Sequence, residues 1–345
     1  MNKKISFLLL IILSLFVLLT GCSKKAMTDE TGFFLDLDDA EKYAKKNNQD
    51  ILIIITSDGD DYISEDFIDD VLTSKAFAET IAKKYSIFHF DFSQKSYEKT
   101  VAAENATKEE EEQAAKYAEL MQTGYQFASL LDCQYTPAIF LMTKERYVIS
   151  EIEYEDEILD VKAFEELLSG YDEKAEQMHQ KLEATQKGTN LERVAAIDSL
   201  YKETPENYKP FLLDLAKTIP DLDKNNESGL CSPYIVVAAE SKAISLFTKG
   251  DIVGAVQAYV SACDNKYINP EERQECYYMA AYLLGSTGAN DYELIVSYLN
   301  LALNACPESS KNEYIKNAIA YYTQQVESSK NAQAASDSAS AEQSK

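Results

Sequence analysis

The sequence ILIII at residues 51–55, continued by TSDGDDYIS at residues 56–64, decides the fold of the first half of the chain. Five aliphatic side chains in a row leave no polar face, which is typical of a central strand covered on both sides. Polar residues follow this run, and residues 64–84 then carry apolar side chains at helical spacing. We therefore predict a buried strand that leads through a polar loop into a long helix.

Helices and strands alternate on either side of this strand. Alternation within residues 85–92 predicts an aromatic strand with Phe88, Phe90 and Phe92 on one face. The order α, β, α, β, α, β, β, α predicts an α/β domain. The remaining helices are expected at residues 38–48, 108–131 and 161–168, and the remaining strands at residues 138–142 and 147–154.

Two short motifs in this domain resemble those of the thioredoxin fold. Tyr135-Thr136-Pro137 stands directly before the strand at residues 138–142, where thioredoxins have their cis-proline. Ser57-Asp58 follows the buried strand, as it does in bacterial thioredoxin-family lipoproteins that continue with Trp-Cys-x-x-Cys. The resemblance covers residues 33–170 and implies a thioredoxin-like domain there. It implies that the degenerate active-site positions are Asp61, Ser64, Thr136 and Pro137.

The residues at these positions determine what chemistry the domain can perform. Thioredoxin catalysis needs a thiolate of lowered pKa and a second thiol that resolves the mixed disulfide. Asp61 and Ser64 stand at the two cysteine positions that the resemblance implies, and they supply neither group. Cys133 is expected to be a buried apolar side chain. We therefore expect a redox-inactive domain, and a thiol-disulfide oxidoreductase with unconventional cysteines is the alternative.

The first 21 residues have the organisation of a signal peptide. Lys3 and Lys4 precede an apolar run at residues 7–19, which ends in Gly21-Cys22. This junction resembles the lipobox of bacterial lipoproteins, which implies a covalent lipid on Cys22. The apolar run is shorter than the roughly 18–20 residues of a membrane-spanning helix. An ordinary secretory signal or a single membrane anchor is the alternative.

The lipobox predicts where the mature protein is held. Acyl chains on Cys22 would anchor it to a bacterial membrane in the cell envelope, with a soluble body on the exported side. Residues 1–21 would be removed, and residues 22–32 would form a lipidated tether. We expect no cofactor other than this covalent lipid.

The charge of the chain restricts its partners. The formal net charge is −25, and removal of residues 1–21 with Lys3 and Lys4 changes it to −27. Such a surface repels nucleic acid, so we expect other envelope proteins as partners, besides the lipid bilayer that the anchor reaches. The acidic cluster Asp58, Asp60 and Asp61 is expected to be a solvated helix start, with a weak cation site as the alternative.

Residues 171–326 show a helical pattern with one repeated motif. Residues 250–262 carry Gly-Asp-x-x-x-Ala-x-x-x-Tyr-x-x-Ala, and residues 291–302 carry Asp-Tyr-x-x-Ile-x-x-x-Leu-x-x-Ala. Both segments resemble the core of a tetratricopeptide repeat, although their spacing exceeds the usual period of 34 residues. The resemblance implies an all-α tetratricopeptide-like domain with a protein-binding surface. Residues 327–345 are rich in Ser, Ala and Gln and predict a disordered tail.

The remaining cysteines and histidines carry weaker signals. Cys263 and Cys276 flank a short turn, so they could form a disulfide in an exported protein or pack as small core residues. His89 is expected to be a hydrogen-bonded core side chain, and His179 lies on a helix predicted to be exposed. No catalytic or metal-ligand spacing is found in the sequence.

Taken together, the sequence predicts a thioredoxin-like α/β domain followed by an all-α tetratricopeptide-like domain. The expected function is that of a membrane-anchored, non-catalytic scaffold or assembly factor that binds proteins in the cell envelope. A thiol-disulfide oxidoreductase and a divalent-cation-binding envelope protein are the alternatives.

Overall fold

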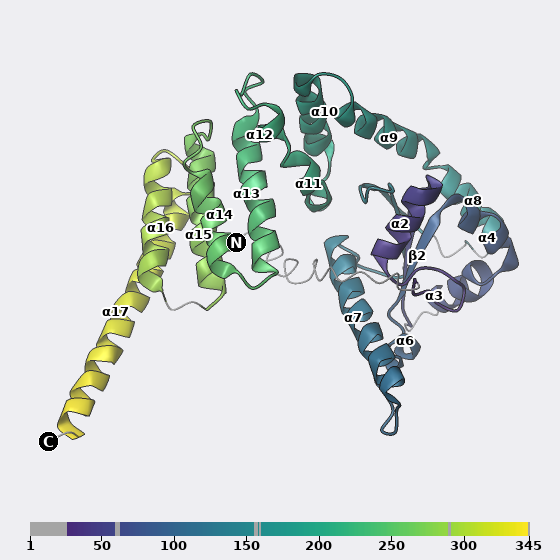
Figure 1. The fold of residues 1–345 in the computed structure, drawn as a ribbon, viewed down its shortest axis with the longest axis horizontal. Helices are drawn as coiled ribbons and strands as arrows, with labels where there is room; N and C mark the ends of the chain where they lie inside the picture. Colours follow the sequence, from purple (N-terminus) through teal and green to yellow (C-terminus); the bar gives the residue numbers. More distant parts are fainter. Residues whose placement is uncertain (1–25, 59–62, 155–157, 159, 289–290, 344–345) are drawn as a thin grey trace. The chain divides into compact units, whose positions relative to one another are not determined.

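The computed structural model describes the chain except for residues 1–25, 59–62, 155–157, 159, 289–290 and 344–345, and it describes residues 332–343 by their backbone alone. The chain divides into two compact units. The first contains residues 1–188 and 199–212, and the second contains residues 189–198 and 213–345. Each unit is described by itself below, and Figure 1 labels most of their helices and the strand β2.

The first unit is built on a four-stranded mixed sheet. Its strands are β1 (Ile51–Thr56), β2 (Ser86–Asp91), β3 (Ala138–Met142) and β4 (Val148–Ile152). They lie in the order β2-β1-β3-β4, in which β1 is parallel to β2 and antiparallel to β3, and β3 is antiparallel to β4. The predicted α/β organisation of the first half of the chain is therefore confirmed at this level.

Both faces of the sheet are covered, as the aliphatic run predicts. All six residues of β1 are buried. One face packs against α2 (Leu37–Asn47) and α7 (Lys108–Leu130), and Phe88, Phe90 and Phe92 share it as predicted. The other face packs against the segments between β1 and β2 and against α8 (Val161–Ser169). Residues 94–98 add the short helix α6 (Gln94–Glu98).

The prediction of one continuous helix at residues 64–84 is wrong. The structure has four pieces, namely α3 (Ile63–Asp66), the π-helical turn η1 (Phe67–Leu72), α4 (Lys75–Glu79) and α5 (Ile81–Lys84). Ser74 causes one break, because its hydroxyl donates to the Val71 carbonyl at 2.7 Å and accepts from the Phe77 N–H at 3.2 Å. Such local bonds compete with the helical ladder.

The described end of the predicted tether is part of the first unit. Asp29 accepts hydrogen bonds from the backbone N–H groups of Thr31 and Phe33, both at 2.9 Å. Phe34 then forms a parallel bridge with Phe88 of β2. Residues 26–34 therefore form a turn fastened to the sheet edge, while residues 22–25 lie outside the described residues.

The helix α9 (Asp172–Gln186) belongs to the first unit, which therefore extends beyond residue 170 to residue 188 and also contains residues 199–212. Ala175 packs against the core that contains α8, and His179 Nε2 lies 2.9 Å from Asp50 Oδ2. His179 is therefore paired rather than free in solvent. Helix α10 (Asn190–Glu203) and the 3-10 turn η2 (Lys209–Leu212) follow.

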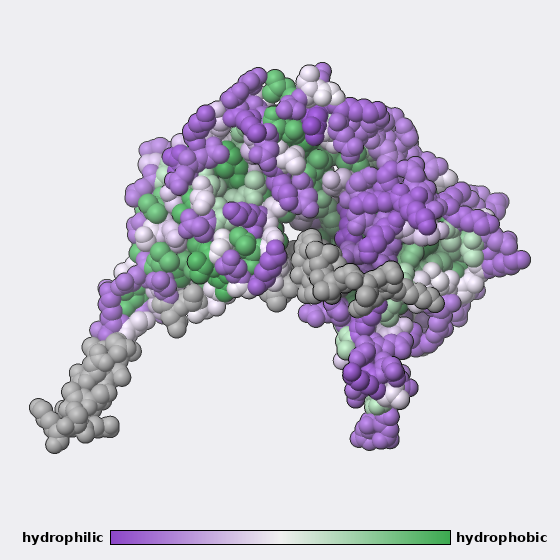
Figure 2. Space-filling view, in the orientation of Figure 1, coloured by the Kyte–Doolittle hydropathy of each residue, from purple (hydrophilic) through white to green (hydrophobic). Residues whose placement is uncertain are grey.

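The second unit is helical. After the short helices α11 (Leu213–Ala216) and α12 (Ile219–Leu222), it contains α13 (Cys231–Phe247), α14 (Ile252–Ala262), α15 (Pro270–Ser286), α16 (Tyr292–Ala305) and α17 (Asn312–Gln343). Consecutive helices from α13 to α17 pack against each other, and α13 also contacts α15. Hydrophobic residues are interspersed with hydrophilic ones on the surface of this block in Figure 2.

The repeated motifs occupy equivalent helices in this unit. Asp251 caps α14 by accepting from the Gly254 N–H at 2.8 Å, and Asp291 caps α16 by accepting from the Leu294 N–H at 3.1 Å. The small and apolar motif residues are buried between helices, namely Ala255, Tyr259, Ile295, Leu299 and Ala302. The motifs thus mark the second helices of two successive helical hairpins.

The predicted disorder of residues 327–345 is not what the structure shows. Helix α17 continues to Gln343. Ala, Gln and Glu are good helix formers, and the segment contains neither Gly nor Pro to end the helix. Within the part of the chain that the structure describes, no helix is long and apolar enough to cross a membrane.

Candidate functional site

The predicted site lies where β1 ends beside the start of β3. The antiparallel register pairs Ile55 with Ala138, which brings the residues just beyond them together. The Thr136–Pro137 peptide bond is cis. The hydroxyls of Ser57 and Thr136 lie 2.6 Å apart although 79 positions separate them in the sequence. Two distant motifs of the sequence therefore meet in one place.

Ser64 completes a group that we call the hydroxyl cluster, namely Ser57, Ser64 and Thr136. The backbone N–H of Ser57 donates to Ser64 Oγ at 3.4 Å, and Ser64 is 4% exposed. Ser57 thus contacts both Ser64 and Thr136, two of the predicted positions. Asp61, the fourth predicted position, lies outside the described residues.

The acidic cluster beside this group is only partly described. Asp58 Oδ2 accepts from the backbone N–H of Gln94 at 2.7 Å, at the start of α6. Asp60 and Asp61 lie outside the described residues. Among the described residues, no group of three or more His, Cys, Asp or Glu side chains is arranged to hold a metal ion. Asp58 serves here to join two loops.

Cys133 is the thiol nearest in sequence to the cluster. Burial raises the pKa of Cys133, and the carboxylates of Glu151 and Asp132 raise it further. The hydrogen bond to the Tyr135 backbone lowers this pKa, but by less than the other effects raise it. Its S–H group donates to the Tyr135 carbonyl at 3.2 Å. A thiol with a raised pKa is mostly protonated at neutral pH and is a poor nucleophile.

Tyr135 gives the site an exposed aromatic ring. Half of this residue is accessible, at 50%, and its hydroxyl donates to Glu151 at 3.0 Å. Burial of the hydroxyl and the adjacent carboxylate raise its pKa to about 12, so it remains a neutral donor. Together with the hydroxyl cluster, this ring offers hydrogen-bonding groups and an apolar face. An unactivated hydroxyl is a poor nucleophile, so this arrangement suits binding better than covalent chemistry.

A buried histidine network lies next to the end of β1. The sequence predicted its histidine as a core residue but not the partners of that histidine. His89 is 7% exposed, and its Nδ1 lies 2.7 Å from Asp29 Oδ2 while its Nε2 lies 3.0 Å from Thr56 Oγ1. The Thr56 hydroxyl donates to Asp91 Oδ1 at 3.0 Å. The prediction of a hydrogen-bonded core histidine is confirmed. Its partner Asp29 lies in the segment predicted to be a tether, so the pair was not predictable from the sequence.

The chemistry of this network follows from its hydrogen bonds. The Thr56 hydroxyl donates its one proton to Asp91, so it accepts from His89 Nε2–H. Burial is the largest single influence on Asp29 and opposes its ionisation, but the interactions with His89, Thr31 and Phe33 together outweigh burial and lower the Asp29 pKa. Thr56 is fully buried, so its hydroxyl is not accessible to a substrate. The network therefore fastens the turn at Asp29 to the sheet.

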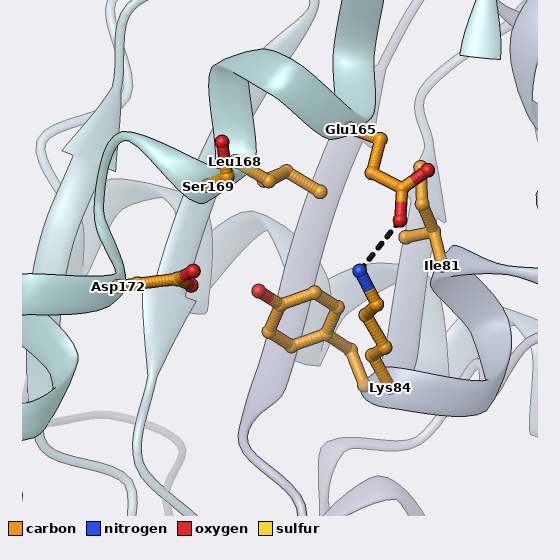
Figure 3. A pocket seen from close by; sticks show the side chains of 7 residues that line it. Ile81, Lys84, Glu165, Leu168, Ser169 and Asp172 are labelled. Carbon is orange, nitrogen blue, oxygen red and sulfur yellow. Dashed lines mark hydrogen bonds and ion pairs between the residues drawn. The ribbon is translucent and has the colours of Figure 1, made fainter. Parts of the chain in front are cut away.

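A small pocket of about 170 Å³ lies on the first unit near the start of β2. Figure 3 shows Lys84 and Glu165 pointing toward each other across it, and their ion pair spans 2.5 Å. Burial, with a contribution from Asp172, raises the pKa of Tyr85 to about 12. Because β1 and β2 are parallel, this pocket and the hydroxyl cluster lie at opposite ends of the sheet. The remaining lining residues are Ile81, Leu168 and Ser169.

Cys263 and Cys276 lie close together in the second unit. Both are buried free thiols, and Cys263 Sγ lies 3.8 Å from the Arg273 carbonyl, one turn before Cys276. A hydrogen bond between the two side chains lowers the pKa of Cys263 and raises that of Cys276. Both side chains are free thiols in the structure, so a disulfide between them stays a prediction.

Comparison with known proteins finds one matching family model and a relative. The family is described as an uncharacterised protein C-terminal domain, and its model matches residues 230–328, from just before α13 into α17. An uncharacterised protein of Treponema pallidum (strain Nichols) is 26% identical over 128 residues, which are 37% of this chain and 42% of that protein. The chain thus spans less than half of that relative's length. No solved structure matches.

Proposed function

We propose that this protein is a lipid-anchored envelope protein that binds other proteins through a thioredoxin-like unit without thiol turnover and a tetratricopeptide-like helical unit. The element order, the mixed sheet and the position of Pro137 before β3 support the thioredoxin-like assignment. The two capped helical hairpins support the tetratricopeptide-like assignment. The lipid anchor on Cys22 rests on the sequence.

One observation carries the binding role of the first unit. The hydroxyls of Ser57 and Thr136 contact each other, and Ser64 fills a position where the resemblance implies a cysteine. The thiol nearest in sequence, Cys133, has a raised pKa and donates to a backbone carbonyl. A domain of this fold in which Asp61 and Ser64 replace the two thiols can still hold an extended peptide by backbone pairing at Thr136.

Site-specific photo-crosslinking tests this role. A photoreactive residue in place of Tyr135, which is exposed beside the hydroxyl cluster, should capture a defined partner in detergent-solubilised native cells. The same residue in place of Tyr43, an exposed tyrosine of α2, is the matched control. Equal crosslinking from both positions, or none from position 135, would count against binding at this site.

A further inference from the structure

The segment that follows the proposed lipid anchor is fastened to the first unit. Asp29 Oδ2 lies 2.7 Å from His89 Nδ1 in the buried network. The Met27 carbonyl accepts from the Leu35 N–H at 3.1 Å, which joins the start of this segment to the backbone beside β2. The chain from residue 27 onward is therefore part of the fold and does not act as a free linker.

This fastening limits how far the first unit can lie from the lipid. Residues 23–25 alone separate Cys22 from Ala26, where the described chain begins. Because the chain advances at most about 3.6 Å per residue, Ala26 lies no farther than about 14 Å from Cys22. The polar headgroup layer on each side of a bilayer is roughly 5–8 Å deep. A lipid on Cys22 would therefore hold the first unit against the headgroups.

One exposed surface adjoins the fastened segment. The carboxylate of Glu30 forms ion pairs with Lys95 and Lys99, at 3.5 and 3.9 Å. Tyr97 of α6 is 54% exposed and Val101 is 66% exposed. The helical turn continues to Val101, whose N–H donates to the carbonyl three residues back at 3.3 Å, so these two apolar side chains lie on one side of it. We call Lys95, Tyr97, Lys99 and Val101 the α6 surface.

Hydrogen bonds to the sheet end fix the orientation of α6. The Ser96 hydroxyl donates to Asp91 Oδ2 at 2.7 Å, and the Gln94 N–H donates to Asp58 Oδ2 at 2.7 Å. A helix of five residues is too short to be stable without such contacts. The two apolar side chains of the α6 surface are thus presented to the outside by a helix that the core holds in place.

We propose that the α6 surface contacts the lipid bilayer, with Tyr97 and Val101 at the headgroup level and Lys95 and Lys99 beside lipid phosphates. The proposal rests on the lipid anchor proposed above and names the side of the first unit that faces the membrane. Tyrosine is enriched at membrane interfaces, and lysines near the surface are attracted to anionic lipid.

The charge of the chain supports this orientation. The formal net charge is −25, so most surfaces of the protein are repelled by anionic headgroups. The α6 surface carries two lysines beside the one carboxylate of Glu30. Lys24 and Lys25 add two more positive charges in the sequence between Cys22 and the described chain. The lysines therefore gather where the lipid is attached.

The proposed contact has a consequence for the hydroxyl cluster. Strands β1 and β2 are parallel, so Ser57 after β1 and α6 after β2 lie at the same end of the sheet. Asp58 joins the two, because it accepts from the backbone of α6. A partner of the hydroxyl cluster would then be bound close to the membrane surface.

Tryptophan fluorescence in vesicles tests this proposal, because the sequence contains no tryptophan. Tyr97→Trp introduces a single reporter on the α6 surface. The matched control is Lys46→Trp, at an exposed position in the last turn of α2, which leads into the start of β1 at the opposite end of the sheet. The full-length protein is purified from membranes and reconstituted into vesicles of phosphatidylcholine and phosphatidylglycerol with brominated acyl chains. Flotation of the vesicles measures the anchor separately.

The brominated lipids should quench the emission of Tyr97→Trp at least about twofold and leave that of Lys46→Trp nearly unchanged. Adding Val101→Asp to Tyr97→Trp should remove most of this quenching, whereas adding Val253→Asp, at an exposed valine of α14, should not. Both valines are exposed, so each variant should fold, which its thermal unfolding checks.

Three results would overturn the contact, namely equal quenching at both positions, no quenching of Tyr97→Trp, or quenching that Val101→Asp does not reduce. Flotation without quenching of Tyr97→Trp would leave the anchor standing and reject the contact alone, as expected if a protein covers the α6 surface instead. Loss of flotation would reject the anchor and, with it, the contact. The two failures are therefore distinguishable.

Discussion

At the scale of single residues, the carboxyl of Glu240 makes the stability of the second unit depend on pH. Its pKa in the folded state is about 7, above the ordinary value of 4.5. Between these values the folded state holds a proton that the unfolded state releases. The contribution of Glu240 to the free energy of unfolding is therefore greatest below pH 4.5, and it is lost as the pH rises through 7.

Glu240→Gln should remove this dependence. We expect the stability of the variant relative to the wild type to increase by about 1–3 kcal/mol between pH 4.5 and pH 8. Urea unfolding at both pH values measures the difference, and Glu308→Gln, at an exposed position before α17, serves as the control. A relative stability that does not change with pH would mean that Glu240 ionises normally in the folded chain.

Thr56→Val tests the histidine network on the other unit. Valine has the shape of threonine but removes the hydroxyl that contacts His89 and Asp91. Leaving these buried groups without that partner should cost about 1–3 kcal/mol of unfolding free energy. Thr56→Ser, which keeps the hydroxyl, should lose less. A Thr56→Val variant that is as stable as the wild type would show that the network does not hold the turn at Asp29.

At the scale of elements, the packing of α7 on the sheet depends on a glycine. A Cβ added to Gly124 would lie 1.9 Å from the ring of Phe90, which is buried in β2. Alanine normally stabilises a helix by up to about 1 kcal/mol relative to glycine. Here the close approach of helix and ring should reverse that preference.

Gly124→Ala should therefore destabilise the first unit by about 1–3 kcal/mol in thermal or urea unfolding. Combining it with Phe90→Leu should give less destabilisation than the sum of the single changes, because the smaller side chain relieves the clash. Ala115→Gly, on an exposed position of the same helix, controls for propensity. If Gly124→Ala stabilised the first unit, α7 would lie farther from β2 than the structure shows.

The elements also show how far the sequence predicts the fold. Strand β1 was predictable because ILIII has no polar face, and β2 because its phenylalanines alternate. The break in the helix at Ser74 was not predictable, because it depends on hydrogen bonds between the Ser74 side chain and nearby backbone groups rather than on apolar spacing. The contact between Asp29 and His89 joins residues 60 positions apart, and the polar neighbours of Asp29 carry no periodic signal.

The candidate site was predictable only through resemblance. Ser64, Thr136 and Pro137 were identified by their places relative to strands, and the structure brings them together with Ser57. The α6 surface was missed, because a helix of five residues carries no periodic signal and the segment beside it was predicted to be a tether.

At the scale of the whole molecule, we propose that a lipid on Cys22 determines where the protein is located. Acyl chains bury methylene groups at about 0.8 kcal/mol each, so more than one chain gives firm membrane attachment. Cys22→Ser should move the protein from the detergent phase to the aqueous phase of Triton X-114. Retention of the variant in the detergent phase would exclude a lipid on Cys22 as the anchor.

The central claim is that the thioredoxin-like unit binds without thiol turnover, and insulin reduction with dithiothreitol tests it most directly. The assay compares this protein, its Cys133→Ala variant and a two-cysteine thioredoxin. Because Asp61 and Ser64 stand at the two cysteine positions that the resemblance implies and the Cys133 thiol has a raised pKa, we predict turnover equal to the protein-free control for both forms. Turnover well above that control, abolished by Cys133→Ala, would contradict the claim and identify the protein as a thiol oxidoreductase.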